Sequence, residues 1–355
     1  MSLHYHYGVR KIYGFRFGYE GLCDRYGHEP IRLTPDLVLN IREGGGTILG
    51  SSRGQQDVPA MVDTLVRMNI GVLFAIGGDG TLRGALAIDT EARRRGLRLS
   101  VIGIPKTIDN DVSFVQKTFG FETAVSEATR ATSAAHAEAI GARNGVGLVK
   151  LMGRDSGFIA AYTALADNNI DFCLVPEVPF TLEALLTALQ RRLERRAHAV
   201  IVVAEGAGQD LMSASGSRDR SGNVRYGDIG IFLRDAIRDH FKTIGTEINV
   251  KYIDPSYVIR SVPANPHDSA FCLLLAHNAV HAAMAGRTGM VVGFWNHRIT
   301  HVPIPLAVVE RKRIDPAGSL WSSVLASTGQ PHDLTSGQSP VERRASTTTE
   351  RGCAV

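Results

Sequence analysis

Short runs of mostly apolar residues alternate along this chain with longer segments that mix apolar and polar positions. The apolar runs occupy residues 72–76, 101–104, 145–151, 171–175, 198–203 and 289–295. Between them, apolar residues recur at helical spacing in segments 121–142, 181–196 and 268–285. Short buried strands separated by helices are typical of parallel sheets with helices on their faces. We therefore predict an α/β fold with mainly parallel sheets.

Two of these runs end in loops that carry charge. Run 72–76 leads into a glycine-rich turn around Asp79, and run 101–104 leads into Pro105–Asp111, which reads PKTIDND. Loops at the carboxyl ends of parallel strands share one edge of a sheet, where ligands bind. Asp109 and Asp111 would repel each other in a plain turn unless a cation or substrate lay nearby. Carboxylates and glycines together favour a site for Mg²⁺ and phosphate.

Length and composition limit the class of protein. A chain of 355 residues exceeds what one simple core holds, so two lobes are expected. With 44% hydrophobic and 21% charged residues, an ordinary globular protein is indicated, and a net charge of +4 is too small to favour nucleic acid as a partner. Neither a membrane span nor a signal peptide is recognisable, so a cytoplasmic location is expected. The four cysteines form no C-x-x-C pair, which argues against a zinc site.

Five motifs in a fixed order resemble those of 6-phosphofructokinases over about residues 7 to 310. They are IGGDGT (Ile76–Thr81), PKTIDND (Pro105–Asp111), KLMGRDSG (Lys150–Gly157), AEGAG (Ala204–Gly208) and YIDPSYVIRSVPAN (Tyr252–Asn265). The resemblance implies two Rossmann-like lobes. It also implies a glycolytic kinase that uses MgATP to phosphorylate the 1-hydroxyl of fructose 6-phosphate, giving fructose 1,6-bisphosphate and ADP.

The resemblance also implies a domain plan. Residues 1–143, completed by about 286–314, would form the nucleotide and magnesium lobe, and residues 144–285 the sugar-phosphate lobe. Residues 315–355 are rich in Ser, Thr and Gly and are expected to be disordered. A homodimer or homotetramer is implied, because some phosphate ligands in the family come from a neighbouring subunit.

The segment Tyr7–Leu22 resembles one that follows a first strand and a glycine-rich loop in the family. That βα unit is not recognisable here. We expect either an N-terminal truncation or a shortened relative, in which an adjacent parallel strand loses its partner and exposes backbone hydrogen-bonding groups on a sheet edge.

Roles follow from matching positions. The catalytic residues implied are Asp109 as general base, Arg53 as stabiliser of the transferred phosphoryl charge, and Lys106. The nucleotide phosphates would contact Arg53, Gly54, Gly78, Asp79, Gly80 and Thr81. Asp79 and Asp111 would hold Mg²⁺. The substrate-binding residues implied are Thr107, Ile108, Asp109, Met152, Gly153, Arg154, Glu205, Lys251, Tyr257 and Arg260.

The phosphoryl donor is judged from one position. Relatives that use pyrophosphate typically carry an aspartate where this chain has Gly80, because that side chain fills the space of the α-phosphate. Gly80 therefore favours ATP, although a lysine at the position of Lys106 also occurs in pyrophosphate users. Three alternatives remain open: a pyrophosphate-dependent enzyme, an NAD or lipid kinase that shares Gly-Gly-Asp-Gly-Thr, and a non-catalytic fragment.

Overall fold

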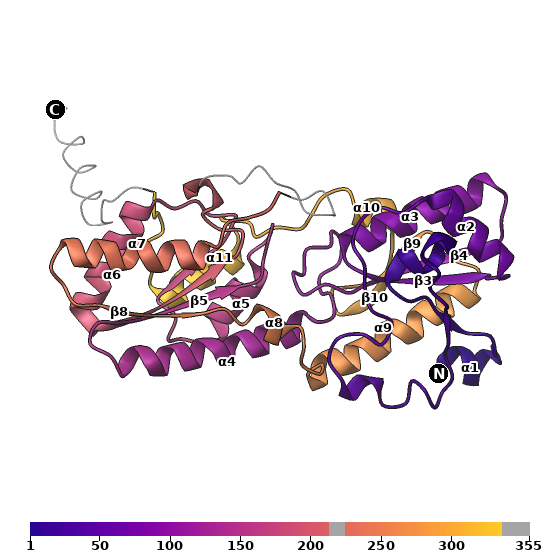
Figure 1. Cartoon of the computed structure of the whole chain (residues 1–355), viewed down its shortest axis with the longest axis horizontal. Helices are drawn as coiled ribbons and strands as arrows, with labels where there is room; N and C mark the ends of the chain where they lie inside the picture. The colour runs from indigo at the N-terminus through magenta and orange to yellow at the C-terminus, as the bar shows by residue number, and fades with distance from the viewer. Residues whose placement is uncertain (213–223, 336–355) are drawn as a thin grey trace, which may run out of the picture. The chain divides into compact units, whose positions relative to one another are not determined.

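The computed structural model describes residues 1–212 and 224–335, which cluster into two compact units. The first unit is built mainly from Met1–Ala124 and Tyr257–Lys312, and the second mainly from residues 125–212, 226–256 and 313–335. Each unit contains a four-stranded sheet (Figure 1). Residues 257–285, which the sequence analysis assigned to the sugar-phosphate lobe, cluster with the first unit because helix α9 (Pro266–Met284) packs on its sheet.

The sheet of the first unit has the strand order β10-β9-β4-β3. Strands β3 (Val72–Gly77), β4 (Ser100–Pro105) and β9 (Met290–Trp295) are parallel, whereas β10 (Arg298–Pro303) returns antiparallel to β9. Strand β3 is the last strand in this order.

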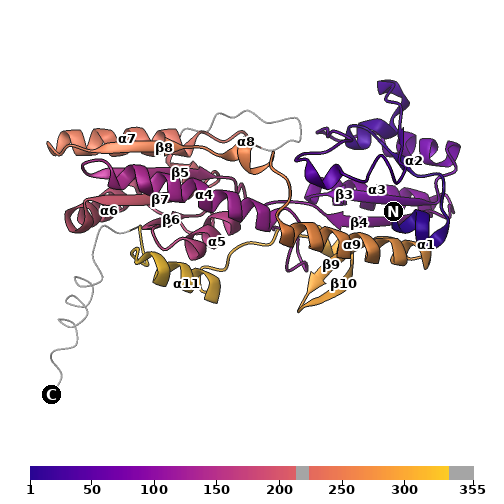
Figure 2. The same ribbon diagram turned by 90° about the horizontal axis from the view of Figure 1, so that it is seen from below.

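Helices cover both faces of this sheet (Figure 2). Val101 of β4 faces α2 (Val58–Arg67) and α3 (Asp79–Arg94), whereas Ile102 faces α9. This alternation follows from the period of two in a strand, which sends successive side chains to opposite faces. Shorter elements complete the unit: α1 (Ser2–Tyr7), β1 (Tyr13–Gly14), η1 (Gly18–Leu22), η2 (Asp24–Tyr26), β2 (Ile31–Arg32), η3 (Ile41–Glu43), α8 (Ser256–Ile259) and α10 (Ile304–Ala307).

The sheet of the second unit is entirely parallel, with the order β6-β7-β5-β8. Its strands are β5 (Gly145–Leu151), β6 (Phe172–Leu174), β7 (His198–Ala204) and β8 (Asn249–Ile253). Its helices are α4 (Phe121–Ile140), α5 (Phe158–Ala166), α6 (Leu182–Arg196), η4 (Gln209–Leu211), α7 (Ile229–Thr243) and α11 (Ser319–Thr328). The alanines of α4 let it approach closely: a Cβ on Gly147 of β5 would lie only 2.9 Å from the Cβ of Ala135. The predicted α/β fold with mainly parallel sheets is confirmed.

The prediction of disorder after residue 314 is wrong for residues 315–335. Helix α11 packs on α5 there and buries Trp321, Val324 and Leu325. These three residues stand at helical spacing, and their burial outweighs the serine-rich composition of the segment. Residues 336–355 of the predicted tail lie outside the described residues. No helix in the described part of the chain is long and apolar enough to cross a membrane.

Candidate active site

The two charged loops of the first unit leave from neighbouring strand ends. Gly77 at the end of β3 is in register with Pro105 at the end of β4, and Lys106 N donates to Gly77 O at 3.0 Å. A Cβ built on Gly78 would lie 3.5 Å from the Cβ of Thr107. The prediction that the IGGDGT and PKTIDND loops meet at one sheet edge is therefore confirmed.

The glycines of the IGGDGT loop differ in what surrounds them. A Cβ on Gly77 would stand 2.2 Å from Thr81 Oγ1, so only glycine fits while Thr81 keeps this position. Gly80, in the first turn of α3, has nothing within 4 Å of the place where a Cβ would be. The space beside Gly80 is open, as the sequence argument about the donor requires.

Two carboxylates of this unit share one cation. Asp79 is the first residue of α3, and both of its carboxylate oxygens accept from Arg83 Nε, at 3.1 and 3.0 Å. Asp111 is buried, with 7% of the residue exposed. The Arg311 guanidinium lies 3.7 Å from Asp79 Oδ2 and 3.9 Å from Asp111 Oδ2. The pKa of Asp111 is raised, mainly by burial and also by Asp79, with Arg311 acting in the opposite direction.

These carboxylates fit a hard divalent cation. Within residues 1–212 and 224–335, no three His, Cys, Asp or Glu side chains gather as a ligand set. Mg²⁺ does not need such a set, because it commonly binds through one or two carboxylates and takes its other ligands from water and phosphate. Asp79 and Asp111 meet that requirement.

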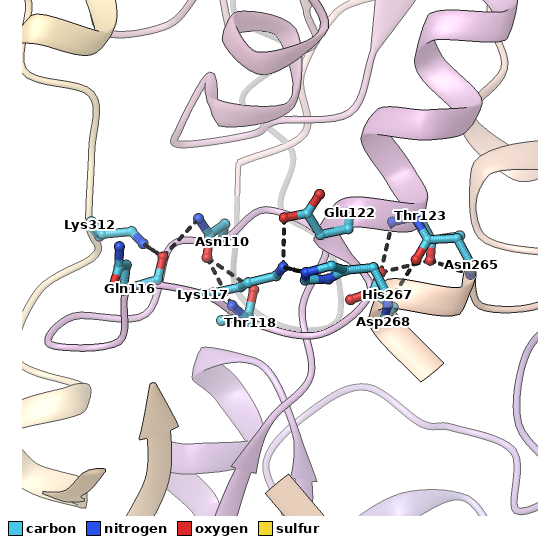
Figure 3. A network of polar contacts seen from close by, with 10 residues as sticks. All are labelled: Asn110, Gln116, Lys117, Thr118, Glu122, Thr123, Asn265, His267, Asp268 and Lys312. Carbon is cyan, nitrogen blue, oxygen red and sulfur yellow. Dashed lines mark hydrogen bonds and ion pairs between the residues drawn. The ribbon is translucent and has the colours of Figure 1, made fainter. Parts of the chain in front are cut away.

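The loop that carries Asp109 is held by its own hydrogen bonds (Figure 3). Asn110 adopts a left-handed backbone conformation with φ of 53°, and its Oδ1 accepts from Thr118 N at 3.0 Å. Thr118 Oγ1 donates to Thr107 O at 2.7 Å, and Thr107 Oγ1 accepts from Asp109 N at 3.1 Å. Asp109 therefore stands on a loop whose two sides are tied together.

A second part of this network fixes the start of α9 (Figure 3). Asp268 is fully buried, and its Oδ2 accepts from both the N and the Oγ1 of Thr123 at 2.7 Å. Thr123 Oγ1 in turn accepts from Asn265 N at 3.0 Å. Nearby, Lys117 Nζ lies 2.8 Å from His267 Nδ1. These bonds hold the chain that follows the YIDPSYVIRSVPAN motif.

Further predicted residues of the first unit are exposed, with Tyr257 in the short helix α8 and the others outside helices. The pKa of Lys106 is lowered, first by burial and second by the charge of Arg260. Tyr257 is 80% exposed, and Arg260 Cζ lies 5.7 Å from the centre of its ring. Arg53 and Gly54 are exposed, and Gly54 has a φ of 106° that favours glycine.

In the second unit, the loops after β5 and β7 are joined. Glu205 N donates to Leu151 O at 2.9 Å, and Gly206 N donates to Gly153 O at 3.1 Å. A Cβ on Gly206 would stand 1.8 Å from Arg154 O, so this contact requires glycine. The structure thus brings the predicted residues Met152, Gly153, Arg154 and Glu205 to one edge of the sheet.

Lys251 does not share that edge. It lies level with Gly147, in the middle of β5, and its ammonium is 3.9 Å from Glu138 of α4. The Arg154 guanidinium lies over the ring of Tyr226 at 4.3 Å. The predicted partners Tyr257 and Arg260 belong to the first unit.

Sequence reasoning missed the segment Glu310–Lys312. Lys312 Nζ donates to Val115 O and Gln116 O at 2.9 and 3.1 Å, and burial lowers the pKa of Lys312 to about 8. Together with Arg311 it borders the PKTIDND loop. The only signal in the sequence is the charged run after the last strand, which reads ERKRID.

Known proteins resemble this chain in sequence. A sequence model described as phosphofructokinase matches residues 1–283. The ATP-dependent 6-phosphofructokinase of Borreliella burgdorferi is 53% identical over 92% of this chain and 75% of its own length. The enzyme of that name from Amycolatopsis methanolica is 51% identical over 94% of this chain and 74% of its own length.

Solved structures share the fold at lower identity. A pyrophosphate-dependent phosphofructokinase from Marinobacter aquaeolei superposes with a TM-score of 0.73 at 18% identity, over 94% of this chain and 85% of that chain. The Pichia pastoris phosphofructokinase gives 0.69 at 21% identity, over 91% of this chain and 34% of that chain. Because the family model and the sequence relatives each cover most of the chain, the chain belongs to the phosphofructokinase family.

Proposed function

We propose that this protein transfers the γ-phosphoryl group of MgATP to the 1-hydroxyl of fructose 6-phosphate, giving fructose 1,6-bisphosphate and ADP. The observation that carries the proposal is the meeting of the IGGDGT and PKTIDND loops at neighbouring strand ends. Relatives named ATP-dependent 6-phosphofructokinase are 51–53% identical to this chain over most of its length, which supports both the reaction and the donor.

Asp109 is proposed as the general base. Its carboxylate would accept the proton of the 1-hydroxyl as that oxygen attacks the γ-phosphorus. The hydrogen bonds around Thr107 and Thr118 support this role, because a general base must be held in position. Lys106 stands close enough to Asp109 for the two charges to attract each other.

Charge on the phosphates would be balanced from several sides. Arg53 is proposed to stabilise the transferred group, and Gly54, Gly78 and Thr81 to offer backbone or hydroxyl contacts to the nucleotide. Asp79 and Asp111 would hold Mg²⁺, which when bound neutralises phosphate charge. ATP is proposed as the donor because the space beside Gly80 is open. The 18% identity to a pyrophosphate-dependent structure supports the shared fold and does not bear on the donor.

Each unit contains residues that are proposed to bind the sugar or its phosphate. In the second unit, Arg154 offers a guanidinium beside the loop that carries Glu205, which would accept from sugar hydroxyls. In the first unit, Thr107 and Ile108 would line the sugar, and Tyr257 and Arg260 would bind the phosphate. Lys251 is proposed for the same role, although its ammonium pairs with Glu138 in this structure. A homodimer or homotetramer in the cytoplasm is proposed as the working form.

The test is phosphorylation of fructose 6-phosphate by the purified chain, with MgATP and magnesium pyrophosphate assayed in parallel. Turnover with ATP is expected, and Asp109→Asn should lower kcat by about 10²–10⁴-fold, the usual contribution of a general base. Its unfolding temperature should stay close to that of the unaltered protein. Turnover with pyrophosphate alone would reassign the donor. No turnover with either donor by a folded protein would favour the non-catalytic alternative.

A further inference from the structure

Phe17 is hydrogen-bonded through its main chain to the segment that leads into Arg53. Its backbone N donates to Leu49 O at 2.7 Å, and its O accepts from Ser52 Oγ at 2.6 Å. The ring of Phe17 lies against Gly50, where a Cβ would stand 2.8 Å from Phe17 Cδ1. One residue therefore holds the chain before Arg53 at three points.

The backbone of Phe17 has a conformation that its neighbours must maintain. Phe17 has a φ of 57° and a ψ of 39°, and Gly18 follows with a φ of 59°. Left-handed residues are uncommon in succession, and phenylalanine, unlike glycine, does not favour this region. Such a conformation persists only where surrounding contacts determine it. The hydrogen bonds to Leu49 and Ser52 supply that restraint.

Tyr19 connects the same segment to the IGGDGT loop. Its Oη donates at 2.6 Å to the backbone O of Thr81, which lies in the first turn of α3. Its ring lies on Gly84, where a Cβ would stand 2.3 Å from Tyr19 Cε2, so a larger residue would prevent this approach. Burial raises the pKa of Tyr19, so the hydroxyl keeps the proton that it donates. Phe17–Tyr19 therefore contacts both the chain before Arg53 and the first turn of α3.

We propose that the segment Phe17–Tyr19 sets the position of Arg53 relative to the first turn of α3, with Ser52 and Tyr19 as its two positioning residues. The inference rests on the proposed function, which assigns Arg53 and the first turn of α3 to the nucleotide phosphates. Ser52 and Tyr19 act through the loops that they hold. A guanidinium stabilises the transferred phosphoryl group only where it is held in place, so releasing either end of the segment should lower kcat.

The test measures kcat and KM of the whole chain with ATP and fructose 6-phosphate. Ser52→Ala removes the hydroxyl that binds Phe17 O, and kcat is expected to fall about three- to tenfold, the size of one lost hydrogen bond. KM for fructose 6-phosphate should stay the same, because no residue proposed for the sugar is released. Ser52→Thr keeps a hydroxyl and should keep kcat. Ser51→Ala is the matched control, the same change at the exposed serine one residue earlier, and should leave kcat unchanged.

A double variant separates positioning from a purely structural role. Arg53→Ala alone should lower kcat by about 10²–10³-fold, as expected when a group that stabilises transition-state charge is removed. Adding Ser52→Ala should then lower kcat by less than about twofold, because the residue that Ser52 positions has lost its charge. A loss of folded protein would instead lower kcat by the same factor in both backgrounds. That outcome, or an unchanged kcat in folded Ser52→Ala, would overturn the proposal.

A second double variant tests whether the two ends act together. Tyr19→Phe keeps the ring on Gly84 but cannot donate to Thr81 O, and it should also lower kcat about three- to tenfold. Combined with Ser52→Ala, the loss should be smaller than the product of the single losses, because releasing one end already frees the segment. Losses that multiply would count against the proposal. If Ser52→Ala does not fold, Tyr19→Phe combined with Arg53→Ala gives the same test from the other end.

Arg53→Ala also tests the assignment on which the inference rests. If this variant folds and its kcat is unchanged, Arg53 does not stabilise the transferred group and the inference fails. Turnover of fructose 6-phosphate with ATP by the unaltered protein would still establish the proposed reaction in that case.

Discussion

Each unit holds two aspartates around one basic side chain, but at different distances. In the second unit, Lys150 Nζ lies 2.8 Å from both Asp228 Oδ2 and Asp254 Oδ2. Asp228 Oδ1 also accepts from Tyr252 Oη at 3.0 Å and from the backbone N of Ile231, which lies in the first turn of α7. Every charge in this group has a hydrogen-bonded partner at close range.

In the first unit, the corresponding cation is Arg311, 3.7 and 3.9 Å from Asp79 and Asp111. The pKa shifts of the aspartates also differ between the two units. Burial raises the pKa of Asp111, whereas in Asp228 and Asp254 burial is outweighed by hydrogen bonds to Lys150 and the pKa is lowered. The second unit therefore holds a closed structural cluster. In the first unit, Asp79 pairs closely with Arg83, and the buried Asp111 carboxylate lies at the longer distance of 3.9 Å from Arg311.

The largest effect is expected when a third carboxylate enters the first unit's site. Gly80→Asp should lower kcat/KM for ATP about ten- to a hundredfold, because the new charge occupies the open space where the nucleotide phosphate is proposed to lie. An aspartate in the first turn of a helix is favourable, so the unfolding temperature should not fall. Activity is measured with ATP and pyrophosphate.

Gly80→Asn is the matched control for this change, because it adds the same volume without charge. A smaller loss in Gly80→Asn would assign the effect to charge, and an equal loss would assign it to volume. Unchanged ATP use in Gly80→Asp would remove the argument that Gly80 selects the donor.

The next effect tests the closed cluster of the second unit. Lys150→Met should lower the free energy of unfolding by about 1–3 kcal/mol, because two part-buried carboxylates lose their shared partner. Urea unfolding followed by circular dichroism measures the change. Lys242→Met removes the same charge from the last turn of α7 and should cost less, since Lys242 is exposed. Equal losses in the two variants would mean that the Lys150 cluster contributes no more to the free energy of unfolding than an exposed lysine does.

The sequence predicted the strands and the meeting of the two loops because both depend on local patterns. Strand register follows from apolar runs, and parallel strands place their carboxyl ends together. It could not predict Arg311, because that residue reaches Asp111 across about 200 positions of chain, through a contact that no local pattern encodes. Helix α11 was missed for a related reason: its three buried residues are too few to stand out in a serine-rich segment.

The smallest effect is expected on the pH dependence of the free energy of unfolding, through the cluster of Lys150, Asp228 and Asp254. The pKa of Asp254 in the folded protein is lowered from 3.8, so the unfolded chain takes up the proton first as pH falls. The stability that Asp254 contributes is thus complete above about pH 4 and is lost as pH falls through its folded pKa. Asp254→Asn should therefore flatten the fall in the free energy of unfolding below about pH 4, by under about 1 kcal/mol because Asp254 is a third exposed. Asp239→Asn, on the exposed face of α7, should leave the slope unchanged. Equal slopes in the two variants would show that the short contacts of the second unit carry no more stability than a surface charge.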